Sequence, residues 1–394
     1  MPEINTQSSL GVLDTSYKPI AAALNREDCD AFVHLGDRFD DTMRYLTRFG
    51  GPDRAYAFIY TPDRSMLCAP SLFAEQARRE FVGDEVRTAA GQEAESAAGR
   101  AVETLESVGG VDRVLVGESV RELELRRLAE TYEVVVADVD VGRETKSEAE
   151  WRRNARTQAA AQHGMDRAET VLAEASPDGD DLIWDGEPLT TERLRREVNA
   201  VMSTHGITDA GNTVIGAGES CADLHFKGND HIHPDETVLL DISPRGPDGY
   251  YGDCTRTFVS GEVGEWETHA YDAVKAAQDA ALETLAGGVG VRAGAPHDAA
   301  CEVLEGRGYQ TGDVDVGLYH GVGHGIGISL HEDPALSGDG PLEVGNVVTV
   351  EPGLYDPDHG GVRLEDIGVV TEDGFRNLTE YPRSIRPDPD ANRW

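Results

Sequence analysis

The chain has 394 residues, of which 73 are acidic and 35 are lysine or arginine, so its formal net charge is −38. This length predicts two domains, each large enough to bury its own core, and excludes a small scaffold held together by disulfides. The negative charge disfavours nucleic-acid binding, because the phosphate backbone requires a basic protein face.

The first part of the chain alternates strand-like and helix-like stretches, which predicts an α/β domain over residues 1–145. A helix within 40–51 is expected to end at the Gly50–Gly51 pair, because glycine is a common helix stop. No catalytic cluster is evident in this domain. The other expected elements are strands at 55–61, 111–117 and 132–140 and helices at 72–82 and 120–132.

A second domain is expected over residues 146–394. Ser147 and Glu150 form a capping-box pattern, which predicts a helix running to about Ala175. The region after it is rich in strand-like stretches, with three further helices interspersed. These helices are expected at 190–206, 266–285 and 296–305.

Two strand pairs in this domain each carry one carboxylate per strand. Asp241 and Asp253 lie 12 positions apart, and Glu351 and Glu365 lie 14 apart, all among apolar residues. The pattern predicts an α+β domain in which two similar β-hairpins face each other and contribute to one centre. The strands of these hairpins are expected at 237–243 with 253–259 and at 347–355 with 362–370.

Ionised carboxylates among apolar neighbours are costly unless they are paired or bound to metal. Arg256 and Arg363 are close enough in sequence to compensate Asp253 and Glu365. Two arginines still leave excess negative charge on the group of acids. Divalent cations are therefore the better balance.

A glycine-rich segment, YHGVGHGIGISLHEDP, adds three histidines at positions 320, 324 and 331. Its alternating glycines let the backbone approach a bound group, and neutral imidazoles serve as metal ligands or proton carriers. The segment is not a dinucleotide-binding GxGxxG motif, because its third glycine falls in the wrong place. It is not an HExxH zinc motif, because position 335 is alanine.

Together these motifs resemble the pita-bread metallopeptidase family, in particular its Xaa-Pro aminopeptidase and prolidase branch. The resemblance rests on Asp241 with DCTRTF, on HGVGHGIG, on TVEPGLY and on VRLEDIG, and it spans nearly the whole chain. YLTRFGG is a weaker similarity to the creatinase/prolidase N-terminal domain. The resemblance implies five metal ligands, Asp241, Asp253, His324, Glu351 and Glu365. Ser243 departs from the family pattern, which more often has glycine there.

The resemblance also implies roles for residues around the metals. Glu351 would shuttle a proton, His225, His320 and His331 would act on the substrate, and Arg363 would orient a substrate carboxylate. The expected cofactor is a pair of divalent ions, manganese being usual in the family, with cobalt, iron or zinc as alternatives. A homodimer is also implied.

The expected activity is hydrolysis of an N-terminal Xaa-Pro bond by an Xaa-Pro aminopeptidase acting on proline-containing peptides. The first alternative is an Xaa-Pro dipeptidase (prolidase). The others are a lyase or small-molecule hydrolase on the same scaffold, and a non-catalytic binding protein. Retention of all five ligands argues against a non-catalytic protein.

Composition also predicts where the protein works. The five cysteines form no CxxC pair, no apolar run of about 18 residues occurs, and no secretion signal is evident, which together favour the cytoplasm and no membrane partner. Only four of the basic residues are lysines, against 31 arginines, which with the acidic excess is typical of a halophilic protein. His231 and His233 are expected at the surface, and Cys254 in the core.

Overall fold

The structure is a computed structural model and describes residues 10–89 and 96–388. It contains two compact units, Val12–Arg143 and the remainder of the described chain. Within the described ranges, no helix is both long and apolar enough to cross a membrane.

The unit Val12–Arg143 is built on a six-stranded mixed sheet with the strand order β4-β3-β2-β1-β5-β6. Strand β1 pairs parallel with β5 and antiparallel with β2, and apolar side chains of these strands pack against helix α4. The strands are β1 (Ala31–Gly36), β2 (Tyr56–Thr61), β3 (Arg64–Pro70), β4 (Glu85–Ala89), β5 (Arg113–Gly117) and β6 (Glu133–Ala137), and the helices are α1 (Lys18–Glu27), α2 (Asp41–Thr47), α3 (Ala74–Glu80), α4 (Ala97–Val108) and α5 (Glu122–Ala129).

Helix α2 ends earlier than the sequence predicts. Its C-cap is Arg48, which has a left-handed backbone with φ of 55°, so the helix stops before the Gly50–Gly51 pair. A left-handed residue other than glycine carries an energetic cost. The buried guanidinium of Arg48 offsets that cost by donating to Thr15 Oγ1 at 2.8 Å and to the Asp14 carbonyl at 3.1 Å.

The first half of the second unit packs two helices on a three-stranded antiparallel sheet, β10-β11-β12. The backbone N–H of Ser147 donates to the Glu150 carboxylate at 2.9 Å, so the predicted capping box is present at the start of α6. The elements are α6 (Glu148–Glu174), α7 (Thr191–Thr204), β10 (Thr213–Ala217), β11 (Thr237–Ile242) and β12 (Cys254–Val259). A small sheet of β7 (Ser176–Asp178), β8 (Asp181–Trp184) and β9 (Glu187–Pro188) lies between the helices in sequence.

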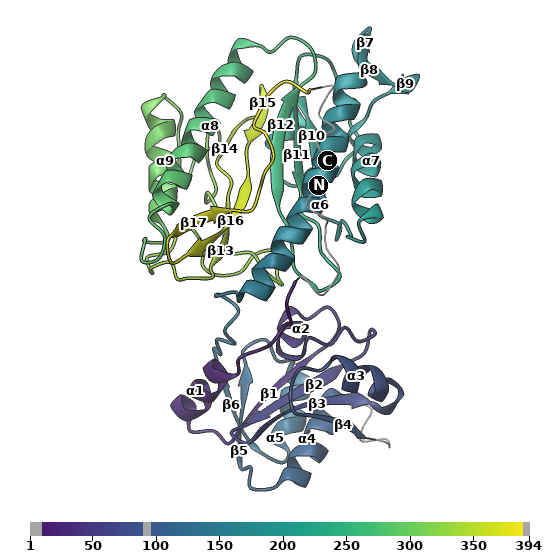
Figure 1. The fold of residues 1–394 in the computed structure, drawn as a ribbon, viewed down its shortest axis with the longest axis vertical. Helices are drawn as coiled ribbons and strands as arrows, with labels where there is room; N and C mark the ends of the chain where they lie inside the picture. Colours follow the sequence, from purple (N-terminus) through teal and green to yellow (C-terminus); the bar gives the residue numbers. More distant parts are fainter. Residues whose placement is uncertain (1–9, 90–95, 389–394) are drawn as a thin grey trace. The chain divides into compact units, whose positions relative to one another are not determined.

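The second half repeats this arrangement with helices α8 (Glu265–Leu285) and α9 (Ala295–Gly306). Figure 1 shows α8 and α9 on one side of the strands and α6 and α7 on the other. Each helix pair covers its own apolar core. The strands of this half are β13 (Val347–Val350), β14 (Gly353–Asp356), β15 (Gly360–Arg363), β16 (Asp366–Thr371) and β17 (Gly374–Asn377).

The second predicted hairpin is divided between two sheets. Strand β13 pairs with β16, whereas β14 pairs with β15. The break follows Glu351, where Pro352 has no N–H to continue a ladder. Glu365 lies at the corresponding break between β15 and β16. Its N–H donates to the Thr255 carbonyl at 3.0 Å. This bond joins the two halves of the unit through their backbones.

Candidate metal centre

Three side chains from separate segments meet between the two halves. Asp253 directly precedes β12, His324 lies in the glycine-rich segment, and Glu365 directly precedes β16. One ligand atom of each lies within 4.8 Å of the others. A carboxylate, an imidazole and a second carboxylate at this separation form a suitable donor set for a divalent cation.

The ring of His324 is oriented for coordination. Its Nδ1–H donates to the Gly325 carbonyl at 2.9 Å, which leaves Nε2 without a proton and 3.4 Å from Glu351 Oε1. Burial lowers the pKa of His324, so the ring is neutral near pH 7. A neutral imidazole with its second nitrogen held by a carbonyl is the usual form of a metal-binding histidine.

Two glycines allow the His324 segment to lie against strand β13. The His324 N–H donates to Thr349 Oγ1 at 3.0 Å, and the Thr349 N–H donates to the His324 carbonyl at 2.9 Å. A Cβ at Gly323 would collide with the Thr349 carbonyl, and one at Gly325 would collide with the Glu332 and Asp333 carbonyls. The glycine pattern noted in the sequence therefore fixes the position of the histidine.

Without a bound cation, the buried acids of the cluster repel one another. Burial, followed by repulsion from Glu365, Asp241 and Glu351, raises the pKa of Asp253 well above its usual range. Burial and repulsion from Glu351 and Asp241 do the same to Glu365, although Thr255 Oγ1 donates to it at 2.7 Å. Divalent ions would relieve this repulsion, so these residues fit the implied metals.

Asp241 is held by groups on two sides. Its Oδ2 lies 2.5 Å from Arg363 Nη2, and its Oδ1 lies 3.0 Å from the Ser243 hydroxyl. The same hydroxyl lies 2.9 Å from Asp253 Oδ1, so Ser243 connects two of the predicted ligands. Arg363 also donates to the Tyr355 hydroxyl at 3.0 Å, and His320 Nε2 lies 3.0 Å from that hydroxyl.

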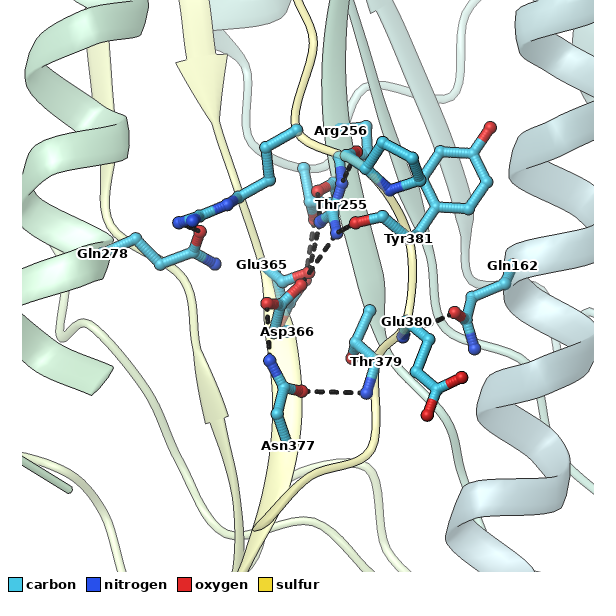
Figure 2. A network of polar contacts seen from close by, with 12 residues as sticks. Gln162, Thr255, Arg256, Gln278, Glu365, Asp366, Asn377, Thr379, Glu380 and Tyr381 are labelled. Atoms are coloured by element: carbon cyan, nitrogen blue, oxygen red, sulfur yellow. Dashed lines mark hydrogen bonds and ion pairs between the residues drawn. The ribbon is translucent and has the colours of Figure 1, made fainter. Parts of the chain in front are cut away.

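A buried arginine supports the cluster from behind. Figure 2 shows Arg256 between Thr255, Glu365 and Asp366, with Asn377 on the far side of Asp366. Its Nη1 donates to the Thr255 and Glu365 carbonyls at 2.8 and 2.7 Å, and its Nη2 donates to Asp366 Oδ1 at 2.8 Å. Arg256 is fully buried, so it fixes the backbone that carries Glu365.

A pocket of about 440 Å³ opens over the cluster, within the range of small-molecule sites. All five predicted ligands line it, as do the predicted histidines and Arg363. The His324 and His331 rings are 4.2 Å apart, whereas His225 is exposed at the pocket wall. The lining residues are Asn212, Val214, Leu224, His225, Lys227, Asp241, Ser243, Asp253, His320, Gly321, His324, Leu330, His331, Glu351, Arg363 and Glu365.

Comparison with known families identifies the catalytic region. The model of metallopeptidase family M24 matches residues 153–372, which is more than half of the chain. The chain belongs to metallopeptidase family M24. This confirms the family predicted from the motifs around Asp253, His324 and Glu365.

Relatives and solved structures agree with this assignment. The Xaa-Pro dipeptidase of Lactobacillus helveticus is 34% identical over 180 residues, 45% of this chain and 47% of the relative. That of Pyrococcus furiosus is 34% identical over 207 residues, 50% of this chain and 57% of the relative. The matched region thus spans about half the length of these curated relatives.

Solved M24-type structures share the fold across both units. The prolidase of Pyrococcus horikoshii superimposes with a TM-score of 0.77 at 24% identity, covering 94% of this chain and 99% of that one. The X-Pro aminopeptidase of Thermotoga maritima gives 0.78 at 23% identity, covering 92% and 99%. The predicted α/β plus pita-bread fold class is therefore confirmed.

The two arginines of this M24 chain have different partners from those expected. Arg256 pairs with Asp366 and not with Asp253, and Arg363 pairs with Asp241 and not with Glu365. For Arg256 the reason is strand geometry, because residues an odd number of positions apart on a strand, such as 253 and 256, point to opposite faces. Arg363 is two positions from Glu365, but its Nη2 pairs with Asp241. Neither arginine forms an ion pair with the carboxylates of the three-residue cluster, so the need for a cation there stands.

Sequence reasoning missed two polar residues of the pocket wall, Asn212 and Lys227. Asn212 lies in the turn before β10, and Lys227 follows His225 by two positions. The available signal was the closeness of Lys227 to His225 in the sequence, since residues two apart in one loop can line the same pocket. The other histidine pair, His231 and His233, is exposed and lies beside Asp181 away from this pocket.

Proposed function

We propose that this protein is a metal-dependent Xaa-Pro dipeptidase, which hydrolyses the bond in front of proline in a free dipeptide. The observation that carries the proposal is the cluster of Asp253, His324 and Glu365, with ligand atoms within 4.8 Å of one another beneath a pocket of about 440 Å³. Membership of family M24 supports peptide hydrolysis at this cluster.

The choice between dipeptidase and aminopeptidase reverses the order expected from the sequence. The sequence motifs put an Xaa-Pro aminopeptidase first, but the curated relatives described above carry dipeptidase names. Solved structures named prolidase and X-Pro aminopeptidase share the fold equally well, so the fold favours neither. The names of the sequence relatives therefore support the dipeptidase.

The metal-binding role falls to the five predicted ligands. Asp253, His324 and Glu365 would hold the ions together with Asp241 and Glu351, which line the same pocket. When bound, divalent ions lower the pKa of a water molecule and polarise the substrate carbonyl. Oxygen donors with one imidazole suit manganese, which we propose as the native metal, and also cobalt, iron or zinc.

Glu351 is the residue we assign to proton transfer. Its Oε1 lies 3.4 Å from His324 Nε2, and burial raises the pKa of its carboxyl above the ordinary value. A carboxyl of raised pKa accepts a proton from attacking water and returns it to the departing proline nitrogen more readily near neutral pH.

The remaining histidines position the substrate. Burial lowers the pKa of His320 and of His331, so both rings are neutral near pH 7. We assign His331 to donate an N–H to the carbonyl oxygen as negative charge develops on it. His320, fixed by Tyr355 and by its Nδ1–H to the Gly321 carbonyl at 2.8 Å, forms with His225 the wall for the proline ring.

The test is hydrolysis of Ala-Pro and of Ala-Pro-Gly by protein stripped of metal and refilled with manganese, in molar potassium chloride and in dilute buffer. The expected result is cleavage of Ala-Pro alone, lost on chelation and in Glu351→Gln. Cleavage of the tripeptide would favour assignment as an Xaa-Pro aminopeptidase. Cleavage of neither peptide with manganese, cobalt, iron or zinc would overturn the peptidase proposal. High salt is included because the composition favours a halophilic, cytoplasmic protein, and light scattering tests the proposed homodimer.

A further inference from the structure

The pocket wall contains two permanent cations, Arg363 and Lys227. The guanidinium of Arg363 is directed at its own chain, with Nη2 on Asp241, Nη1 on the Tyr355 hydroxyl at 3.0 Å and Nε 3.3 Å from Thr255 Oγ1. Arg363 is also buried. The role of binding a substrate carboxylate, expected for Arg363 from the family resemblance, therefore suits Lys227 better.

The segment that carries Lys227 is fixed on both sides. Before it, the His225 N–H donates to Asp223 Oδ1 at 3.2 Å. After it, the Gly228 carbonyl accepts hydrogen bonds from Thr191 Oγ1 and Arg195 Nη2, each at 3.2 Å. These contacts anchor the backbone, so the side chain of Lys227 extends along the pocket wall from a defined point.

The ammonium of Lys227 retains donors for a ligand. It donates to the Gly211 carbonyl, and an ammonium has three N–H groups, so two remain. Among the described residues, no carboxylate lies within ion-pair distance of it. The residue after Gly211 is Asn212, which also lines the pocket and whose side-chain amide carries two N–H donors.

The charge of the pocket interior determines which substrate end this cation receives. Four carboxylates line the interior, Asp241, Asp253, Glu351 and Glu365. In the proposed function these acids bind the divalent ions, and Asp241 also pairs with Arg363, so Lys227 is the cation of the pocket wall that remains open to a substrate carboxylate. A free Xaa-Pro dipeptide presents that carboxylate one residue after the scissile bond, whereas in a longer peptide the same position holds a neutral amide.

We infer that Lys227, together with the Asn212 amide, binds the free carboxylate of the substrate proline and restricts the protein to dipeptides. The inference rests on the proposed function and adds its specificity determinant. Loss of a charge-assisted hydrogen bond of this kind lowers affinity by about 10- to 100-fold.

The experiment compares Ala-Pro with Ala-Pro amide, which differ only in the charged terminus, on manganese-refilled protein. Wild type is expected to favour the free acid in kcat/KM by about 10-fold or more. Lys227→Gln should raise KM for Ala-Pro by about 10- to 100-fold with little change in kcat, so that the acid-to-amide ratio approaches one. Lys227→Arg should restore most of the preference. Lys275→Gln, the same change on helix α8 outside the pocket wall, is the matched control.

The outcomes separate the two proposals. If wild type cleaves neither substrate, the proposed function fails and this inference fails with it. If wild type cleaves Ala-Pro but Lys227→Gln keeps the wild-type acid-to-amide ratio, the inference alone is overturned. Thermal unfolding checks that each variant folds, and Asn212→Ala, which should lower the same ratio, provides a second reading if Lys227→Gln does not fold.

Discussion

Arg363 Nη2 lies 2.5 Å from Asp241 Oδ2 in a largely buried ion pair, with 4% and 16% of the two side chains exposed. The protein thus supplies its own cation to one of the five predicted metal ligands. This contact orients the Asp241 carboxylate independently of any bound metal, and among the described residues no lysine or arginine forms an ion pair with Asp253 or Glu365.

Arg363→Met should destabilise the metal-free protein strongly. Removal of one partner of a buried pair leaves an uncompensated charge, so we expect a loss of about 3–5 kcal/mol in the free energy of unfolding. Urea denaturation in the presence of a chelator measures it. Arg126→Met on the exposed pair with Glu122 is the control and should cost less than about 1 kcal/mol. Equal effects of the two changes would contradict this account.

Glu365→Gln should stabilise the metal-free protein at neutral pH. Burial and neighbouring carboxylates raise the pKa of Glu365 in the folded state, so the folded chain binds this proton more tightly than the unfolded chain. Folding stability therefore falls as pH rises from the unfolded value of about 4.3 towards the folded pKa. The glutamine cannot ionise and should avoid this loss.

The measurement is a pair of denaturation curves for wild type and Glu365→Gln, recorded between about pH 4 and about pH 8. The advantage of the variant should be largest at the upper end and should disappear towards the lower end, where wild type is protonated. If the stability advantage of Glu365→Gln does not change with pH, the raised pKa of Glu365 in the folded state is disproved. With manganese present the order should reverse, because the variant has lost a ligand.

Lys146 and Glu332 form a second buried pair, with Nζ 2.5 Å from Oε1 and side-chain exposures of 2% and 5%. Lys146→Met should lower the free energy of unfolding by about 3–5 kcal/mol, because Glu332 would be left buried without its cationic partner. The double variant Lys146→Met with Glu332→Leu should recover at least half of that loss in a denaturation cycle. A double variant no more stable than the single one would contradict the ion-pair explanation.

Arg256→Lys should weaken metal binding without touching a ligand. Arg256 makes contacts with Thr255, Glu365, Asp366, Tyr381 and Pro382, and a lysine has only three N–H groups for these five partners. Because residues behind a metal site orient its ligands, we expect about 10- to 100-fold lower manganese affinity, measured by calorimetry. Arg126→Lys is the control and should bind manganese as wild type does.

Part of this structure follows from local patterns. The capping box of Ser147 and Glu150 fixes the start of α6, and the alternation around Asp241 and Asp253 predicts the β11–β12 hairpin. These features depend on residues close together in the chain. The glycine spacing around His324 likewise predicts a close backbone approach, which the contact with Thr349 realises.

Other features depend on contacts between residues far apart in the sequence, so local patterns do not predict them. The end of α2 is set by the contacts of Arg48 with Asp14 and Thr15, more than 30 residues away in sequence. The division of the second hairpin requires the Glu365 backbone to pair with Thr255 of the other half. The partners of Arg256 were mispredicted for the same reason, since proximity in sequence does not show which face of a strand a side chain occupies.

The bond between the Glu365 N–H and the Thr255 carbonyl has a consequence for the order in which the protein matures. Asp253 is translated before His324, and Glu365 is translated after both. A nascent chain therefore has no complete donor set to capture a cation until its last strands are translated and docked. We therefore expect a cation to bind only after β16 has been translated and has docked, and a chain truncated before Glu365 to lack one of the three cluster residues.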